Sequence, residues 1–172
     1  NLIKAGFPLK FFARRKEVID EVTSQGGKGL PSMKELARQS AWIIFCLPNT
    51  ETVEEVLFGK DGMVEVLKPG QVVIDCGTIH PLSTRKIAQS LMEKGIPFLD
   101  APVSGMEARA KAGTLAIMVG GEESAFQQVR PALEAMGNKV TYVGASGNGQ
   151  MMKMINNALL DIHCAALAEL LA

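Results

Sequence analysis

The chain has 172 residues, the size of one domain, and its 47% hydrophobic and 21% charged residues are ordinary for a globular protein. Its 18 basic and 18 acidic residues give a formal net charge of zero. This balance argues against a nucleic-acid partner or a membrane surface bound through bulk charge. No uninterrupted apolar run reaches the roughly 18 residues of a membrane span, so we expect no membrane partner.

The cysteines and histidines do not form a pattern that binds metal. Cys46, Cys76 and Cys164 are odd in number and lack metal-ligand spacing, which indicates reduced thiols and a cytoplasmic or other reducing compartment. His80 and His163 lie too far apart in the sequence to suggest a metal site. We therefore expect no bound metal.

Helical and strand patterns alternate along the chain at short spacing, which predicts an α/β fold with a largely parallel, doubly wound sheet. Residues 1–5 resemble the end of a helix and Gly6 its C′ glycine, so we expect further chain upstream. The predicted strands are residues 8–13, 41–47, 72–75, 98–103, 115–119 and 140–143. The predicted helices are residues 16–24, a short helix capped by Ser32, and residues 51–58, 81–94, 122–136 and 150–172.

Two of these strands, residues 41–47 and 72–75, are continuous apolar runs, which predicts burial on both faces. In parallel α/β sheets, ligands bind outside the carboxyl ends of the strands. Polar and turn-forming residues lie at these ends, although such residues are also common in ordinary loops. They are Arg14, Leu47-Pro48-Asn49, Thr78 and Ser104-Gly105, the last of which opens a glycine-punctuated loop to Gly113.

The last predicted helix, residues 150–172, carries a lysine and an asparagine four residues apart, Lys153 and Asn157, which therefore lie on one face. We place Lys153 in the first turn, where the helix dipole lowers the pKa of its amine and suits it to general acid/base catalysis. The alternative is a solvated surface lysine. A separate apolar face is expected to pack against the protein; it comprises Met151, Ile155, Ala158, Leu159 and Ile162.

The segment from Leu99 to Gly105, Leu-Asp-Ala-Pro-Val-Ser-Gly, resembles the β-hydroxyacid dehydrogenases, in particular the 3-hydroxyisobutyrate dehydrogenase group with glyoxylate and tartronate-semialdehyde reductases. The resemblance covers essentially the whole chain. Three further matches support it: Gly113-Thr114-Leu115 through Gly121, Gly147-Asn148-Gly149-Gln150…Lys153…Asn156-Asn157, and the cofactor loops at Leu47-Pro48-Asn49 and Asp75…Thr78-Ile79…Pro81.

This resemblance implies a role for each matching residue. Lys153 resembles the catalytic lysine, and Asn157 resembles the asparagine that orients the substrate. Ser104 and Gly105 resemble the loop that binds the substrate carboxylate. Contacts to the cofactor are implied for Leu47, Pro48, Asn49 and Thr78. The expected function is NAD(P)-dependent interconversion of a small 3-hydroxy acid and its semialdehyde.

The chain departs from the family pattern in two respects. Met106 stands where the family usually has glycine, and its side chain is expected to narrow the substrate pocket or reshape the loop. The Gly-x-Gly-x-x-Gly turn that binds pyrophosphate is missing from the 172 residues. We therefore expect residues 1–149 to be a Rossmann-like NAD(P)-binding domain without its first strand, and residues 150–172 to lead into an absent all-α domain. On this view the 172 residues alone are inactive, and the full-length protein is a homo-oligomer.

Cofactor choice and competing functions remain open at this point. Arg14 and Arg15 follow the first predicted strand, where an acidic residue would bind the ribose of NAD, so we expect NADP to be favoured over NAD. A 6-phosphogluconate dehydrogenase-like enzyme is an alternative, but it would be expected to have histidine in place of Gln150. A non-catalytic dinucleotide-binding or scaffold protein is another, and the presence of Lys153 argues against it.

Overall fold

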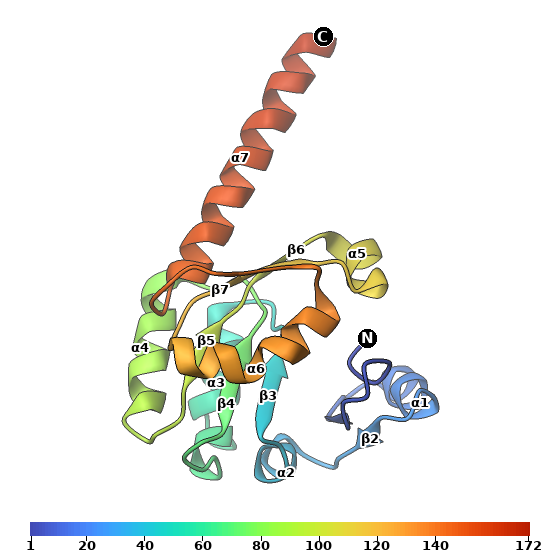
Figure 1. Ribbon diagram of the computed structural model, residues 1–172, viewed down its shortest axis with the longest axis vertical. Coiled ribbons are helices and arrows are strands. Elements are labelled where there is room, and N and C mark those ends of the chain that lie inside the picture. The colour runs from blue at the N-terminus through green and yellow to red at the C-terminus, as the bar shows by residue number, and fades with distance from the viewer.

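The computed structural model describes all 172 residues as alternating helices and short strands (Figure 1). The strands are β1 (Lys10–Phe11), β2 (Lys28–Gly29), β3 (Trp42–Phe45), β4 (Val72–Asp75), β5 (Phe98–Asp100), β6 (Val103–Ser104), β7 (Ala116–Val119) and β8 (Lys139–Tyr142). The helices are α1 (Lys16–Ser24), α2 (Met33–Gln39), α3 (Thr50–Phe58), the 3₁₀ turn η1 (Met63–Glu65), α4 (Pro81–Met92), α5 (Met106–Ala112), α6 (Glu123–Met136) and α7 (Asn148–Leu171).

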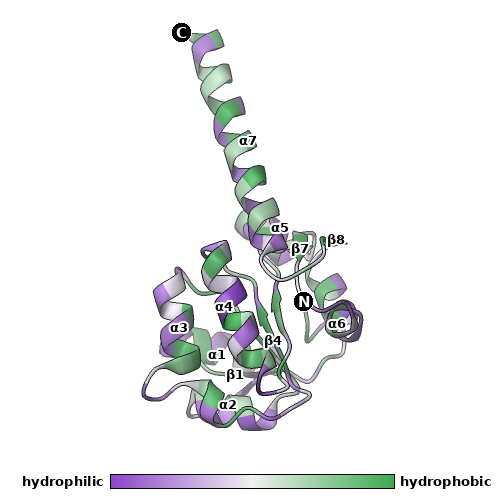
Figure 2. Cartoon of the chain, turned by 90° about the vertical axis from the view of Figure 1, so that its left-hand side faces the viewer, coloured by the Kyte–Doolittle hydropathy of each residue, from purple (hydrophilic) through white to green (hydrophobic).

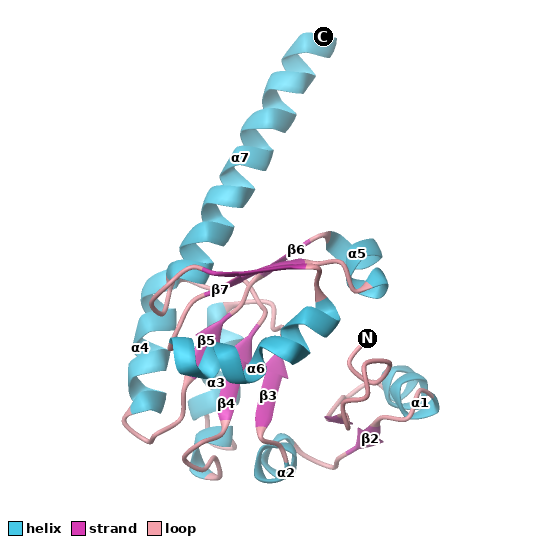
Figure 3. Cartoon of the chain, in the orientation of Figure 1, coloured by secondary structure: helices cyan, strands magenta, loops and turns pink.

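The strands form three small sheets, which are parallel except for one pairing (Figure 3). β3, β4 and β5 are parallel neighbours, β1 pairs in parallel with β2, and β7 pairs in parallel with β8. β6 runs antiparallel to β7, and a bridge from Asp100 to Gly120 joins this sheet to the end of β5. The predicted α/β class with a mostly parallel sheet is therefore confirmed.

The central strand β4 shows why the fold is wound on both faces. Val73 packs into one apolar cluster, with residues of α3 and α4, whereas Val72 and Ile74 pack into a second cluster with α6. Alternate side chains of a strand point to opposite faces, so an unbroken apolar strand requires cover on both sides. All four residues of β4 are buried, as the sequence predicts.

β3 was expected to be buried on both faces, and this expectation is only partly met. Ile43 is buried, but Trp42, Ile44 and Phe45 remain half-exposed. The reason is that the outer edge of β3 faces a groove of about 460 Å³ instead of another strand. The opposite wall of this groove includes Phe7, whose ring lies 6.1 Å from that of Trp42 between centroids. β1, β2 and α1 lie beyond the groove (Figure 1).

Several predicted ends are formed by the expected local contacts. Gly6 has a φ of +87°, and the N–H groups of Gly6 and Phe7 donate to the carbonyls of Ile3 and Leu2, which is the Schellman ending of a helical turn. The Ser32 hydroxyl accepts from the backbone N–H of Glu35 at 3.1 Å and caps α2. α1 spans the predicted residues.

Three predictions of secondary structure are wrong. The predicted strand 98–103 is interrupted at Ala101 and Pro102, and Val103 belongs to β6 in another sheet. β2 was not predicted, because Lys28 and Gly29 carry no strand pattern and are extended only through their pairing with β1. Residues 104–113 were expected to form a loop, but Met106–Ala112 form the helix α5. The glycines at 105 and 113 bound this helix, and the Ala-rich segment between them has good intrinsic helix propensity.

α7 begins at Asn148, two residues before the predicted start, and extends away from the rest of the protein (Figures 1 and 2). The apolar face that was expected to pack is exposed instead: Ile155, Leu159 and Ile162 are 52%, 50% and 62% exposed. By length and mean hydropathy (1.2) α7 is also the one helix that could cross a membrane, a test that core helices of soluble proteins pass as well.

Candidate functional site

The carboxyl ends of β3 and β4 bring two predicted cofactor segments into contact. The loop after β3 contains Leu47, and the loop after β4 contains Gly77 and the exposed Thr78. A Cβ atom on Gly77 would lie 2.7 Å from the Leu47 carbonyl oxygen, so only glycine allows the two backbones to approach this closely. Pro48 is exposed beside this contact. The structure thus places Leu47, Pro48 and Thr78 at one edge of the sheet.

Asn49, the fourth residue predicted at this edge, has a structural role in the fold. Its side-chain oxygen accepts from the N–H of Thr52 at 2.9 Å and from the Thr52 hydroxyl at 2.6 Å, so Asn49 caps α3. The next residue, Thr50, accepts through its hydroxyl from the backbone N–H of His80 at 3.1 Å. The two loops are therefore held together at both ends.

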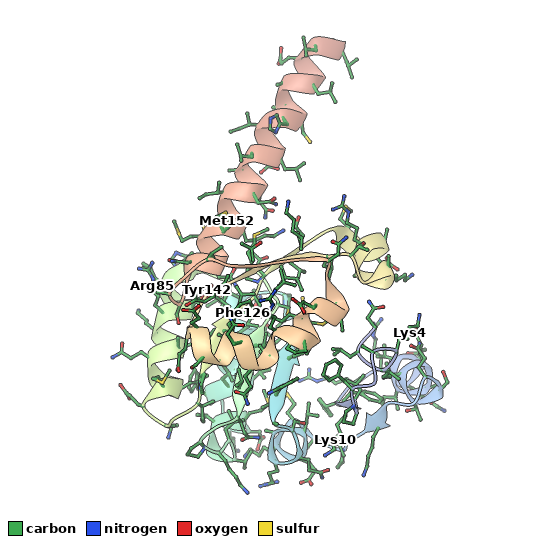
Figure 4. All side chains as sticks on the ribbon, in the orientation of Figure 1. Lys4, Lys10, Arg85, Phe126, Tyr142 and Met152 are labelled. Carbon is green, nitrogen blue, oxygen red and sulfur yellow. The ribbon has the colours of Figure 1, made fainter.

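The start of α7 is held by a buried carboxylate from β5. Oδ1 of Asp100 accepts from the N–H of Gly147 at 2.9 Å, and Oδ2 accepts from the N–H of Gln150 at 3.0 Å. These N–H groups have no partner within the helix, and a negative charge is favoured at a helix N-terminus. Arg85 of α4, labelled in Figure 4, donates to the Ser146 carbonyl at 3.3 Å, just before the start of α7.

The side chain of Gln150 joins α7 to the loop after β4. Its Oε1 accepts from the N–H of Ile79 at 3.1 Å, and its Nε2 donates to the carbonyl of Gly77 at 2.9 Å. Gln150 is fully buried, so both ends of its amide are satisfied by backbone alone. The two bonds lie on either side of Thr78.

Lys153 lies half-buried on α7, one turn beyond Gln150, and its amine makes no hydrogen bond or ion pair in the structure. Partial burial lowers the pKa of Lys153. The sequence-based reason for this shift was wrong: α7 begins at Asn148, which puts Lys153 in the second turn, and the effect of the helix dipole is concentrated in the first. Loss of solvation is therefore the cause, and it favours the neutral amine.

Asn156 and Asn157 connect the lysine-bearing part of α7 to the predicted substrate loop. Nδ2 of Asn156 lies 3.5 Å from the Ser104 hydroxyl and 3.4 Å from the side-chain oxygen of Asn157. All three side chains are half-buried. Ser104, Asn157 and Lys153 thus lie on neighbouring elements, with α7 packed against β5 and β7.

The substrate loop contains one residue in an unusual conformation. Met106 has a φ of +56° and is the only non-glycine residue of the chain with positive φ. Its side chain is 89% exposed, so packing does not hold it there. Left-handed backbone costs an L-residue roughly 1–2 kcal/mol, and such strain is often found at functional sites. Gly105 before it has a φ of +142°.

Arg14 lies apart from these residues. It follows β1 in the lobe beyond the groove, is exposed, and forms no ion pair. The structure therefore does not bring Arg14 near Lys153. A free cation at the carboxyl end of a parallel strand is available to an anionic ligand.

Two buried acids beneath the site have raised pKa values. Burial raises the pKa of Asp75 from 3.8 to about 6; the N–H of Gly77 opposes this rise, and the neighbouring Asp100 adds a smaller contribution to it. Oδ1 of Asp75 accepts from that N–H at 2.8 Å, whereas its buried Oδ2 has no partner. Burial also raises the pKa of Asp100, against the effect of its N–H donors.

Sequence reasoning did not assign functional roles to four residues of this arrangement: Asp75, Asp100, Gln150 and Asn156. Asp75 and Asp100 end apolar strands, and an acid at such a position is a signal of a buried, hydrogen-bonded carboxylate. Gln150 and Asn156 belong to the segment that resembles the family, but their contacts to distant segments have no signal of their own, because polar residues in an exposed helix are common. The structure contains no cluster of three or more His, Cys, Asp or Glu side chains that could hold a metal ion.

Comparison with known proteins identifies the architecture. Residues 1–144 match the NAD binding domain of 6-phosphogluconate dehydrogenase. The chain belongs to this family of NAD-binding domains. It is 38% identical to an NAD-dependent L-serine dehydrogenase of Pseudomonas aeruginosa over 100% of this chain and 58% of that protein. It is 37% identical to 2-hydroxy-3-oxopropionate reductase of Escherichia coli, over 99% of this chain and 58% of that protein.

A solved structure agrees with these relatives. The 3-hydroxyisobutyrate dehydrogenase of Mycobacterium tuberculosis, determined with L-serine, superposes with a TM-score of 0.91 at 33% identity, over 98% of this chain and 57% of that one. The resemblance to the β-hydroxyacid dehydrogenases is thereby confirmed for this NAD-binding domain. The chain spans less than two thirds of the length of each relative.

Proposed function

We propose that the full-length protein containing this NAD-binding domain is an NAD(P)-dependent oxidoreductase that interconverts a small 3-hydroxy acid and its semialdehyde. The observation that carries the proposal is Lys153: an unpaired, half-buried amine with a lowered pKa, one helical turn before Asn157 on α7, whose Asn156 contacts Ser104. Relatives named for L-serine, 2-hydroxy-3-oxopropionate and 3-hydroxyisobutyrate support this substrate class.

The residues at the carboxyl edge suit the nicotinamide end of a cofactor. Leu47 and Pro48 offer an apolar surface, and the exposed Thr78 offers a hydroxyl. NAD(P), when bound, supplies the hydride acceptor for the alcohol carbon. Residues for the pyrophosphate are not found in the 172 residues, since these contain no Gly-x-Gly-x-x-Gly turn.

The remaining steps belong to the chain itself. The Ser104 hydroxyl and the Gly105 N–H bind the substrate carboxylate, and Asn157 orients the hydroxyl-bearing carbon. Neutral Lys153 accepts the hydroxyl proton during oxidation, and its ammonium form returns a proton during reduction. A compact amine with a lowered pKa can do both near neutral pH. Met106 lies next to the carboxylate site and limits the size of the group on the substrate's second carbon.

Arg14 favours NADP over NAD in this proposal, because its exposed guanidinium can pair with a 2′-phosphate. The Pseudomonas relative is named NAD-dependent, so the preference rests on Arg14 and Arg15 of this chain alone. We further propose that the full-length protein is a homo-oligomer of a reducing compartment. No membrane or nucleic acid is part of the proposal.

The proposal is tested with the purified full-length protein and a panel of small 3-hydroxy acids, including L-serine and 3-hydroxyisobutyrate, with each cofactor. We expect reduction of the cofactor by at least one of these acids, and its loss in Lys153→Ala. Cofactor binding without hydride transfer to or from any member of the panel would instead favour a non-catalytic dinucleotide-binding protein.

A further inference from the structure

Gln150 is one of four polar or charged residues that are buried in this chain, with no exposed surface. It is the third residue of α7, one turn before Lys153. A buried amide needs partners for both its oxygen and its nitrogen, because an unsatisfied polar group in the interior costs roughly 1–3 kcal/mol. Gln150 finds both in a single loop 71 and 73 residues away, at Ile79 and Gly77.

These two bonds bracket one exposed residue of the candidate cofactor site. The loop runs from Gly77 through Thr78 to Ile79, and the amide of Gln150 holds the residue on each side of Thr78. The backbone at Thr78 is therefore fixed relative to α7. Its side chain stays exposed at the carboxyl edge.

The backbone of Gln150 is fixed as firmly as its side chain. Its N–H donates to Asp100, which lies in register with Asp75 on the next strand. Asp75 in turn accepts from the N–H of Gly77, and the Gln150 side chain donates to the carbonyl of the same residue. The contacts form a closed ring through two strand ends, one loop and the first turn of α7.

Two glycines of this ring, Gly77 and Gly149, bring backbones into very close contact. A Cβ on Gly77 would lie 2.7 Å from the carbonyl oxygen of Leu47, and a Cβ on Gly149 would lie 2.5 Å from those of Asp100 and Met118. These contacts fix the loop against Leu47 and the start of α7 against β5 and β7, but neither of them joins the loop to α7. The side chain of Gln150 makes the hydrogen bonds between these two elements, so Gln150 sets the distance from Thr78 to Lys153.

We propose that Gln150 is a positioning residue, which sets the distance between the hydride acceptor beside Thr78 and the proton acceptor Lys153. The inference rests on the proposed function, since both groups act on the same carbon–oxygen bond. Misplacement of reacting groups by about 1 Å can cost about 100-fold in rate. Loss of Gln150 therefore lowers kcat more than it lowers the affinity for cofactor or substrate.

The test uses Gln150→Met and Gln150→Glu in the full-length enzyme, assayed in the reduction direction with saturating substrates. Methionine keeps the length of glutamine but removes both hydrogen bonds. Gln71→Met is the matched control, because Gln71 also bridges backbone groups, donating to the Ala37 carbonyl at 2.7 Å and accepting from the Lys68 N–H at 2.6 Å. Gln71 lies at the other end of β4, away from the site.

We expect Gln150→Met to lower kcat by about 10–100-fold, with cofactor Kd changed less than about threefold. Its deuterium isotope effect, measured with cofactor labelled at the transferred hydrogen, should rise as the chemical step becomes limiting. Gln71→Met should lower the melting temperature to a similar extent and leave kcat unchanged. A Gln150→Met enzyme with near-normal kcat and isotope effect would show that Gln150 stabilises the fold only.

Gln150→Glu keeps the inference testable if the methionine variant does not fold. A protonated glutamic acid can accept from the Ile79 N–H and donate to the Gly77 carbonyl, as glutamine does. The ionised carboxylate has no proton to donate and is repelled by the Gly77 carbonyl oxygen. The kcat of Gln150→Glu relative to wild type should therefore recover as pH falls, and a constant ratio would contradict the inference.

Wild type and Lys153→Ala are assayed in parallel. An inactive wild type contradicts the proposed function, whereas an active wild type whose kcat is unchanged in the Gln150 variants contradicts this inference alone.

Discussion

Asp75 and Asp100 occupy the same register on the neighbouring strands β4 and β5, and each binds the backbone of a different segment of the candidate site. Asp75 accepts from Gly77 in the loop that carries Thr78, and Asp100 accepts from Gly147 and Gln150 at the start of α7. Two adjacent acids, both fully buried, therefore hold the loop that carries Thr78 and the start of α7 on one sheet.

Asp75 makes the stability of the protein depend on pH. Its folded-state pKa is raised from 3.8 to about 6, so its protonated form is favoured on folding. The stability that this provides is fully present below pH 3.8 and is lost as pH rises through about 6. A rise of this size corresponds to roughly 3 kcal/mol. We predict that Asp75→Asn shows a smaller loss of unfolding free energy than wild type between pH 4 and 8.

The measurement is denaturant unfolding across that pH range, and Asp20→Asn on the exposed surface of α1 serves as the control. Asparagine keeps the acceptor for Gly77 but cannot ionise, so the slope with pH should fall in Asp75→Asn only. Parallel curves for wild type and Asp75→Asn would show that folding does not raise the pKa of this carboxyl.

Arg14 is predicted to determine the preference for NADP. Its guanidinium is exposed and unpaired at the end of β1, and hydrogen bonds to charged groups contribute about 1.5–3 kcal/mol. Arg14→Ala in the full-length enzyme should lower kcat/KM for NADP by about 10–100-fold and leave that for NAD nearly unchanged. Arg130→Ala, which removes a cation from α6, should change neither. Equal efficiency with the two cofactors in wild type would contradict the assignment.

Met106 is predicted to restrict the substrate. Met106→Gly removes both the side chain and the positive-φ strain, whereas Met106→Ala removes the side chain only. If the side chain narrows the pocket, both variants should raise kcat/KM for a 2-ethyl relative to a 2-methyl 3-hydroxy acid, by about tenfold. An unchanged ratio in both variants would show that Met106 does not contact the substrate. A change in Met106→Gly alone would attribute selectivity to loop conformation.

The exposed face of α7 is predicted to cause self-association of the 172-residue chain, which we also expect to bind NADPH weakly. Ile155 and Ile162 are more than half exposed and lie on one side of the helix. Large exposed apolar patches favour association. Sedimentation velocity should show oligomers that dissociate in Ile162→Lys but persist in Met92→Lys, a comparable change on α4. A monomeric chain with micromolar affinity for NADPH would contradict both expectations.

Much of the fold could be predicted from local signals. The apolar run at β4, the capping side chain of Ser32 and the C′ glycine at position 6 each indicate a single local structure, and each is confirmed. β2 and α5 could not be predicted in this way. β2 exists only through its pairing with a distant segment, and α5 lies between glycines that are typical of loops. The half-exposure of β3 depends on the groove beside it, which no property of its own sequence reveals.

The candidate site was predicted in part. Leu47 and Thr78 follow strands that the sequence predicts, so their common edge could be anticipated from the topology alone. The direction of the pKa shift of Lys153 was predicted correctly, but the reason given for it was wrong. Lys153 lies in the second turn of α7, beyond the first turn where the helix dipole acts, and its pKa is lowered by burial. The role of Gln150 depends on contacts more than 70 residues away in sequence, and these become visible only in the structure.

The account depends most on Lys153 as the group that transfers the proton. Arginine keeps the positive charge but does not release a proton near neutral pH, so it separates proton transfer from simple binding of the carboxylate. We predict that Lys153→Arg and Lys153→Ala in the full-length enzyme both lower kcat by about 10²–10⁴-fold, with little change in cofactor affinity. A Lys153→Arg enzyme with nearly full kcat and a raised KM would contradict the assignment and leave Lys153 as a residue that only binds substrate.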